Sequence, residues 1–151
     1  MVERIAYAAD GWGVGELVFA DGLLAWHELP RPGAEADGDH PLAGRLRRYF
    51  DGSRDDFADV ELELEWCTPF QQRAVEALRS IPYGETATYG EVAALAGHPN
   101  AQRALGSVCG SNRFAIVVPC HRVVAAGGLG SYGSLGPGYK RRLLELEGVV
   151  L

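Results

Sequence analysis

Two apolar segments near the start of the chain are separated by a tight-turn signal. Residues 16–20 and 23–29 are mostly apolar, and the Asp21-Gly22 pair between them is typical of a two-residue β-hairpin turn. A loop is predicted over residues 31–41, and after it apolar side chains recur at helical spacing over residues 42–50. The pattern therefore predicts an antiparallel hairpin followed by one helix.

Apolar and acidic residues alternate over residues 60–66. The four apolar side chains are separated by glutamates, and a period of two is typical of a strand with one buried face. This predicted strand completes a small α+β unit, which we place at residues 1–66. The unit contains no group of side chains that indicates chemistry.

The next part of the chain is mainly helical. Thr68-Pro69-Phe70-Gln71 and Thr88-Tyr89-Gly90-Glu91 both have the residue types of a capping box. In a capping box, an N-cap hydroxyl and a side chain three residues later each accept the other residue's backbone N–H. The two motifs predict one helix that ends near Ser80 and a shorter one that ends near Ala96.

A further short helix is predicted over residues 101–108, with Asn100 as its N-cap. Two short helices joined by a tight turn that contains glycine have the proportions of a helix-turn-helix. Residues 114–118 are apolar and typical of a buried, β-rich segment. A glycine-rich loop (127–138) then precedes a last helix over residues 140–147.

The two predicted domains differ in charge. Residues 1–66 form a small N-terminal antiparallel-sheet domain with a helix, and residues 67–151 form a mostly helical domain with the helix-turn-helix, so the fold class is α+β. The net charge of −6 divides into −9 for the first domain and +3 for the second. Residues 101–142 hold six basic residues and no acidic one, which is a modest signature of nucleic-acid binding. An ordinary uneven surface is the alternative explanation.

Composition excludes several classes of protein. No apolar run is long enough to cross a bilayer and the N-terminal residues lack a signal-peptide pattern, so we expect a cytoplasmic protein with no membrane partner. The three cysteines and four histidines are scattered, without a CxxC pair or other ligand spacing. Neither a disulfide framework nor a metal site is therefore predicted, although spacing alone leaves a catalytic metal open.

The sharpest local motif is Pro119-Cys120-His121-Arg122-Val123. A free thiol has a pKa of about 8.5 and is mostly protonated at neutral pH, so a nucleophilic cysteine needs a base. A histidine oriented by a carboxylate serves this purpose in many enzymes, and a turn after Pro119 would bring Cys120 and His121 together. A buried structural cysteine beside a chance histidine explains the same pair. The motif alone leaves both interpretations open.

The wider sequence resembles the O6-alkylguanine–DNA alkyltransferases. The likeness extends over roughly residues 67–150, and several motifs in the same order over more than half of a chain are highly specific. The matching segments are TPFQQRAVEALRSIPYGETATYGEVAALAGHPNAQRALGSVCGSN, the PCHRV segment, Gly130-Ser131-Tyr132, and KRRLLELEG from Lys140 to Gly148. Residues 1–66 are similar to the family only in general plan, so their implied role is mainly structural.

The resemblance implies a self-alkylating DNA-repair protein that needs no cofactor. Cys120 would take the alkyl group from O6-alkylguanine once per molecule and irreversibly, and O4-alkylthymine is left open as a second substrate. His121 would deprotonate Cys120 through a water, Glu147 would orient His121, and Asn112 would brace the active-site turn. Tyr89 would donate a proton or hydrogen bond at guanine N3, which makes guanine a better leaving group.

The same resemblance implies how the substrate pocket is built. The backbone N–H of Gly133 would face the O6 oxygen, and Tyr132 would border the pocket. The backbone carbonyls of Cys120 and Val123 would accept from the exocyclic amine of guanine. The loop over residues 132–140 is longer than usual in the family, and Gly133 stands where a serine is often found. The motifs therefore leave the accepted size of the alkyl group undetermined.

The implied partner is double-stranded DNA, bound by a monomer through the minor groove with the alkylated guanine flipped out. The second helix of the helix-turn-helix would enter this groove, which is about 6 Å wide. The small residues Ala101, Ala104 and Gly106 would allow close approach. Arg103 matches the arginine that replaces the flipped base in the stack, and Arg122 is assigned to DNA contacts as well.

Two other functions compete with this interpretation. A lesion-binding protein of the alkyltransferase-like class would lack the acceptor cysteine, which is present here as Cys120. A Cys-His hydrolase would need an oxyanion hole and would turn over, whereas an alkyltransferase stops after one equivalent. Cys109, on the second helix, is interpreted as a small core residue and not as a second acceptor.

Overall fold

The computed structural model describes residues 1–33 and 35–151, and these residues form two compact units. Each unit combines a long stretch of chain with a shorter one: Met1–Glu65 with Arg113–Ala115, and Trp66–Asn112 with Ile116–Leu151. The return of residues 113–115 to the first unit has no signature in the sequence. Of the loop predicted over residues 31–41, Ala34 lies outside the described residues.

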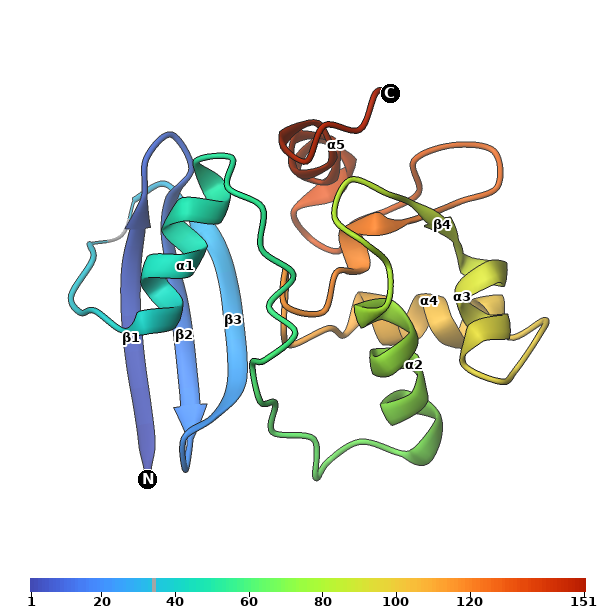
Figure 1. Cartoon of the computed structure of the whole chain (residues 1–151), viewed down its shortest axis with the longest axis horizontal. Helices are drawn as coiled ribbons and strands as arrows, with labels where there is room; N and C mark the ends of the chain where they lie inside the picture. Colours follow the sequence, from blue (N-terminus) through green and yellow to red (C-terminus); the bar gives the residue numbers. More distant parts are fainter. Residues whose placement is uncertain (34) are drawn as a thin grey trace. The chain divides into compact units, whose positions relative to one another are not determined.

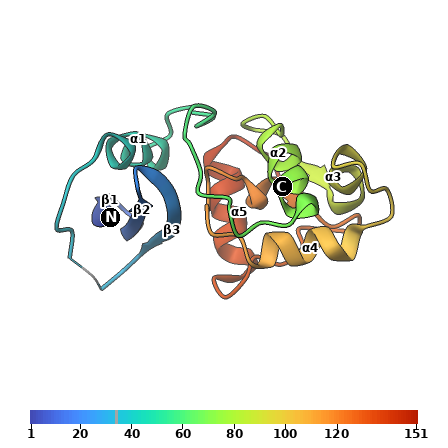
Figure 2. The same cartoon turned by 90° about the horizontal axis from the view of Figure 1, so that it is seen from below.

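The first unit is a three-stranded antiparallel sheet with a helix over one face (Figures 1 and 2). Its elements are β1 (Val2–Ala9), β2 (Gly13–Ala20), β3 (Leu23–Arg31) and α1 (Pro41–Phe50). The turn between β2 and β3 places both Asp21 and Gly22 at positive φ, 52° and 83°, as a two-residue hairpin requires. The predicted hairpin and helix are confirmed, and β1 extends the sheet.

A buried chain of hydrogen bonds ties β1 and β3 to residues 113–115. The Tyr7 hydroxyl lies 2.6 Å from Nε2 of His27, and Nδ1 of His27 lies 2.6 Å from the carbonyl oxygen of Ala115. Burial lowers the pKa of His27 to about 4, so the ring is neutral, and Nδ1 carries the proton because a carbonyl only accepts. The His27 backbone N–H donates to the Arg113 carbonyl at 2.8 Å. These bonds hold the segment that shortly precedes Cys120 in the chain.

The strand predicted over residues 60–66 is wrong. The segment makes a single bridge, between Leu62 and Leu24 of β3. Farther along β3, His27 bridges to Phe114, so residues 113–115 occupy the edge that a longer strand would need. The Glu63 carboxylate accepts the backbone N–H of Glu65 at 3.0 Å and ends the extended stretch. Strand formation requires an unoccupied edge, which an alternating pattern does not reveal.

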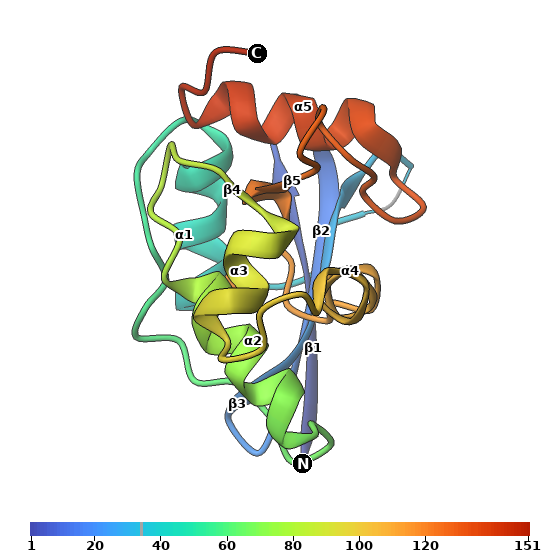
Figure 3. The ribbon, with the colours of Figure 1, turned by 90° about the vertical axis from the view of Figure 1, so that its right-hand side faces the viewer.

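The second unit is mostly helical and contains one short pair of strands (Figure 3). α5 lies on one side of this pair, and α2, α3 and α4 lie on the other. The elements are α2 (Pro69–Arg79), β4 (Ala87–Thr88), α3 (Tyr89–Leu95), α4 (Gln102–Gly110), β5 (Val123–Val124) and α5 (Gly136–Leu146). The α+β fold class is confirmed. No helix within the described ranges has both the length and the apolar character that crossing a membrane requires.

The capping boxes predicted at Thr68 and Thr88 are both present. Each threonine hydroxyl accepts a backbone N–H three residues later, and the side chains of Gln71 and Glu91 accept the threonine N–H in return. Asn100, in contrast, is not an N-cap. It adopts a φ of 72° in the turn between α3 and α4, and Ala101 begins α4 without a side-chain cap.

The last helix begins earlier than predicted. α5 starts at Gly136, so the end of the glycine-rich segment forms its first turn. Pro137 fits there because the first helical N–H groups have no partner within the helix, and proline lacks that group. The predicted end is nearly unchanged, because Glu147 is the C-cap and Gly148 follows at a φ of 88°.

The parallel pairing of β4 with β5 brings distant motifs together. Residues 87–88 pair with residues 123–124. β5 directly follows the short 3-10 turn Cys120–Arg122, and α3 begins at Tyr89 directly after β4. The pairing therefore places the start of α3 next to the Cys120 turn, although the two are far apart in the sequence.

Candidate active site

Two hydrogen bonds to one carbonyl hold the turn that carries Cys120. The Val118 carbonyl accepts from the side-chain amide of Asn112 at 2.9 Å and from the backbone N–H of Cys120 at 2.8 Å. Pro119 lies between Val118 and Cys120 and is the N-cap of the 3-10 turn, so the turn expected after this proline is present. Cys120 is buried, with 4% of its surface exposed. Asn112 thus lies where it can brace the turn.

The segment before this turn is buried, as predicted, but it forms a turn and not a strand. Residues 114–118 are all at most 9% exposed. Ile116 has a φ of 71°, which is costly for a β-branched side chain and persists only where the surroundings enforce it. The Asn112 side chain donates to the Val118 carbonyl and so fixes the backbone two residues after Ile116.

His121 and Glu147 form the hydrogen-bonded pair that the family resemblance implies. His121 Nε2 lies 2.7 Å from Glu147 Oε2, and both side chains are fully buried. Burial lowers the pKa of His121 despite the nearby carboxylate, so the ring is neutral at pH 7 and competent to accept a proton. Burial raises the pKa of Glu147, but hydrogen bonds from His121 and Arg122 outweigh it and hold the pKa well below its usual value.

The Arg122 side chain binds this carboxylate. Its Nε lies 2.8 Å from Oε1 of Glu147, its Nη2 lies 3.0 Å from Oε2, and its Nη1 donates to the Ile81 carbonyl at 2.7 Å. The guanidinium also lies over the Tyr83 ring, 5.7 Å from the centroid. With 3% of its surface exposed, Arg122 cannot reach a phosphate. The predicted DNA contact is wrong because a buried arginine needs, and here has, a buried carboxylate.

A buried lysine, Lys140, lies with Tyr89 near the thiol. Its Nζ donates to the carbonyls of Val123 at 2.5 Å and Ser131 at 3.3 Å, and lies 5.8 Å from the centre of the Tyr89 ring. A Cβ on Gly130 would meet Lys140 Nζ at 3.4 Å and the Tyr89 hydroxyl at 3.5 Å. Burial lowers the pKa of Lys140, and nearby cysteine thiolate charge opposes this shift. Burial raises the pKa of Tyr89, so the Tyr89 hydroxyl keeps its proton and can donate it.

Lys140 was not among the predicted site residues, although α5 contains a signal for it. Lys140, Leu143, Leu144 and Glu147 are buried and follow the i, i+3, i+4, i+7 spacing of one helix face. A lysine and a glutamate at the two ends of an apolar stripe are exceptions that indicate a polar function. Lys140 also donates to the Val123 carbonyl, the group that the resemblance assigns to the exocyclic amine of guanine. A bound guanine would therefore share this oxygen with Lys140.

The side chain of Cys109, which lies on the last turn of α4, acts on the Cys120 thiol. Cys109 and burial together raise the pKa of Cys120 well above its usual value. Cys120 in turn lowers the pKa of Cys109, and the Lys140 ammonium acts in the same direction. That Cys109 is a small core residue and not a second acceptor stays a prediction.

The loop after β5 supplies the remaining predicted pocket residues. Tyr132 is partly covered, its ring lies 6.4 Å from that of Tyr139, and burial raises its pKa well above the usual value. Gly133 is exposed and has a φ of 50°.

Residues 69–149 match the family model described as 6-O-methylguanine DNA methyltransferase, DNA binding domain. The match spans more than half of the chain and contains every residue of the site described above. The chain belongs to this family. A methylated-DNA–protein-cysteine methyltransferase of Mycobacterium bovis is 50% identical over 122 residues, which are 80% of this chain and 70% of the relative. The chain is thus a member of an enzyme family of methyltransferases.

Solved structures of the family resemble the whole chain. The crystal structure of Mycobacterium tuberculosis O6-methylguanine methyltransferase has a TM-score of 0.80 and 38% identity, and covers 97% of this chain and 93% of its own. The crystal structure of Mycobacterium tuberculosis OGT in complex with DNA has a TM-score of 0.79 and 38% identity, with coverages of 96% and 92%. The likeness therefore includes the N-terminal unit.

In this family member, α3 and α4 pack on each other, as a helix-turn-helix requires. Arg103 and Ala104 are exposed on α4, whereas Leu105 is fully buried. A Cβ on Gly106 would meet no atom within 4 Å, and Ala101 is half-buried at the N-cap. The outer face of α4 therefore presents an exposed arginine among small residues.

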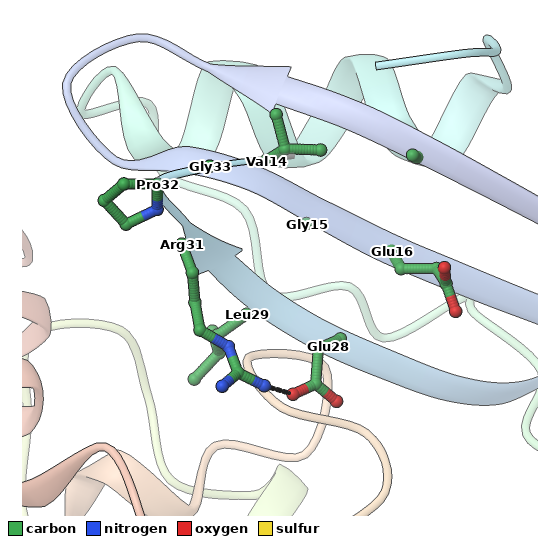
Figure 4. A pocket seen from close by; sticks show the side chains of 9 residues that line it. Val14, Gly15, Glu16, Glu28, Leu29, Arg31, Pro32 and Gly33 are labelled. Atoms are coloured by element: carbon green, nitrogen blue, oxygen red, sulfur yellow. Dashed lines mark hydrogen bonds and ion pairs between the residues drawn. The ribbon is translucent and has the colours of Figure 1, made fainter. Parts of the chain in front are cut away.

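A separate hollow of about 420 Å³ lies in the N-terminal unit, along β2 and β3 (Figure 4). Its charged lining residues include Glu16, Glu28 and Arg31, and the Arg31 guanidinium is paired with the Glu28 carboxylate. It contains no cysteine or histidine, so it offers no nucleophile of the kind found at Cys120. Within residues 1–33 and 35–151, no three His, Cys, Asp or Glu side chains gather as metal ligands.

Proposed function

We propose that this protein repairs alkylated DNA by transferring the alkyl group of O6-alkylguanine to Sγ of its own Cys120. The observation that supports this most directly is a buried thiol next in sequence to a neutral His121 that is bonded to Glu147, inside the domain that matches the family model. The reaction is stoichiometric and irreversible because the product is a stable thioether. It requires no cofactor.

The proposed step is a single displacement. Because Nε2 of His121 donates to Glu147, Nδ1 is the ring nitrogen that receives the Cys120 proton through a water. The thiolate attacks the alkyl carbon, the S–C bond forms, and the C–O6 bond breaks with its electron pair leaving on guanine. Tyr89 donates at N3 and the Gly133 N–H donates to O6, so negative charge on the departing base is neutralised as it develops.

The Lys140 ammonium is suited to stabilise the thiolate before attack. It is buried near both cysteines, where the effective dielectric constant is low and the attraction between opposite charges is strong. Cys120 and Val123 would offer backbone carbonyls to the guanine amine, and Tyr132 would border the alkyl group. Asn112 would keep the turn in place while the nucleophile reacts.

The proposed partner is double-stranded DNA. A monomer would place α4 in the minor groove, with Ala101, Ala104 and Gly106 allowing close approach, and Arg103 would fill the gap left by the flipped guanine. This assigns DNA binding and chemistry to residues 67–151 and a mainly structural role to residues 1–66. We place the reaction in the cytoplasm.

Mass spectrometry after incubation with duplex DNA that contains O6-methylguanine tests the proposal. Trypsin cleavage after Arg113 and Arg122 isolates the peptide with Cys120, residues 114–122, from those with Cys109 and Cys67. We expect one added methyl group on this peptide, one equivalent per protein, and none on the other two. Continued product formation would favour a hydrolase, and no adduct despite tight binding would favour a lesion-binding protein. The same assay with O4-methylthymine tests that second substrate.

Changing Arg103 to alanine should slow repair of duplex DNA by about 10- to 100-fold, because flipping the base costs a few kcal/mol that the arginine helps to offset. Reaction with free O6-benzylguanine needs no flipping and should be nearly unchanged. Single-turnover rates with both substrates test this, with the exposed Arg141→Ala as a matched loss of charge. Equal losses on duplex and free base would show that Arg103 supports the fold or the pocket.

A further inference from the structure

The segment that leads into the Cys120 turn is held by side chains at two points. At its start, Nδ1 of His27 donates to the Ala115 carbonyl oxygen, at 2.6 Å. At its end, the side-chain amide of Asn112 donates to the Val118 carbonyl at 2.9 Å. Asn112 has a role in the proposed function, whereas His27 has none in it.

His27 is a buried group that uses both nitrogens of its ring. The residue is 3% exposed. Because Nδ1 donates to Ala115, Nε2 has the lone pair and accepts from the Tyr7 hydroxyl at 2.6 Å. Tyr7 is fully buried, and its ring stacks on the His27 ring with centroids 5.8 Å apart. The stacking and the two bonds fix the direction in which Nδ1 points.

The bond from His27 ends directly before a strained residue. The Ala115 carbonyl and the Ile116 N–H belong to one planar peptide unit, so a bond to this carbonyl fixes the plane that precedes the φ rotation of Ile116. That φ is 71°, which a β-branched residue keeps only where its surroundings enforce it. Without His27, the plane would be free to rotate and Ile116 would relax toward negative φ. Ile116 lies only four residues before Cys120, so the turn would move with it.

We propose that His27 is a positioning residue for alkyl transfer, which acts through the Ala115 carbonyl and Ile116 to hold the Cys120 turn in its reactive place. This role rests on the proposed function, in which Cys120 is the acceptor. The attacking sulfur must lie in line with the C–O6 bond that breaks, and a misplacement of about 1 Å can cost roughly 100-fold in rate. A buried histidine of the first unit therefore contributes to the rate without a step in the chemistry.

Replacing His27 with phenylalanine removes both side-chain hydrogen bonds and keeps a ring. Single-turnover reaction with free O6-benzylguanine should slow by about 10- to 100-fold, because the sulfur is no longer held in line. Tyr7→Phe is the matched control: it removes the other bond of the same buried chain, leaves the bond to Ala115 and should react at nearly the wild-type rate. His27→Asn, whose amide can donate from the position of Nδ1, should recover most of the rate. Equal slowing in Tyr7→Phe and His27→Phe would overturn the proposal.

Alkylation by iodoacetamide distinguishes a displaced turn from loss of the fold. Cys120 is buried, so a loosened turn should react faster with this reagent even as alkyl transfer slows. In His27→Phe we expect about 10-fold faster labelling of Cys120 alone, because loss of a buried hydrogen bond favours the open turn. Faster labelling of all three cysteines would show general unfolding and would overturn the positioning role, as would unchanged labelling of Cys120. Trypsin separates the three on peptides 55–73, 104–113 and 114–122.

Hydrogen exchange of the wild-type protein tests the same coupling without a variant. The His27 N–H donates to the Arg113 carbonyl and the Cys120 N–H donates to the Val118 carbonyl, so each amide reports whether its end of the segment is closed. After correction for intrinsic rates, the Cys120 N–H should exchange no faster than the His27 N–H. Faster exchange at Cys120 would show that the turn opens while the segment stays on β3, and the proposal would be wrong. Labelling and exchange do not depend on alkyl transfer, so their failure is distinct from failure of the proposed function.

Discussion

Replacing Cys120 with alanine should abolish alkyl transfer while leaving affinity for DNA that contains O6-methylguanine nearly unchanged. The thiolate is the only proposed acceptor, whereas affinity comes from phosphate contacts and from the pocket around the base. The turn should survive because it is held by the Val118 carbonyl and not by the thiol. Transfer of a labelled methyl group and a fluorescence binding titration, both at one fixed salt concentration, measure the two properties.

Cys109 makes this a demanding test, because it is the second cysteine that influences the pKa of the Cys120 thiol. The double variant Cys109→Ala, Cys120→Ala is therefore the matched control. A methyl group on Cys109 in the single variant, absent in the double variant, would show that either sulfur can act as acceptor. Loss of binding in parallel with loss of transfer would instead show that Cys120 supports the pocket.

Replacing His121 with alanine should slow alkyl transfer by about 10²- to 10⁴-fold, the usual contribution of a general base. The Cys109 side chain and burial both raise the pKa of the Cys120 thiol, so little thiolate forms without a base. The variant should be rescued as the pH rises, because the thiol then ionises by itself. Single-turnover rates measured from low to high pH check this, and a deficit that persists at high pH would contradict the relay.

The transfer rate of the wild-type protein should depend on pH in a defined direction. Protonated His121 cannot accept a proton, so transfer should fall as the pH drops through the pKa of this histidine. Burial lowers that pKa, so the fall should occur below pH 6.5, the usual value for histidine. The His121→Ala profile should lack this low-pH step. His121→Ala also leaves the ion pair between Arg122 and Glu147 intact, which makes it the cleaner variant.

Glu147→Gln should combine slower transfer with lower stability. Without the carboxylate charge, Arg122 would be a buried cation with no ionic partner, a change typically worth roughly 3–5 kcal/mol of folding free energy. Urea unfolding measures this loss. Glu145→Gln, exposed on the same helix, is the matched control and should change neither property.

The sequence by itself determined the features whose causes are local. The capping boxes at Thr68 and Thr88 and the hairpin turn at Asp21-Gly22 depend on residues only a few positions apart, so residue types suffice to predict them. The order of the PCHRV and KRRLLELEG segments was likewise enough to indicate the family, and the pairing of His121 with Glu147 was expected from it.

Only the tertiary structure decided which groups from distant segments meet. It placed residues 113–115 on the edge of β3 and so removed the strand expected at 60–66. It turned Arg122 inward to Glu147 and buried Lys140 where its charge lowers the pKa of Cys120. Burial, ion pairing and the resulting pKa shifts depend on how helices and turns pack, and a pattern of residue types along a chain does not specify these neighbours.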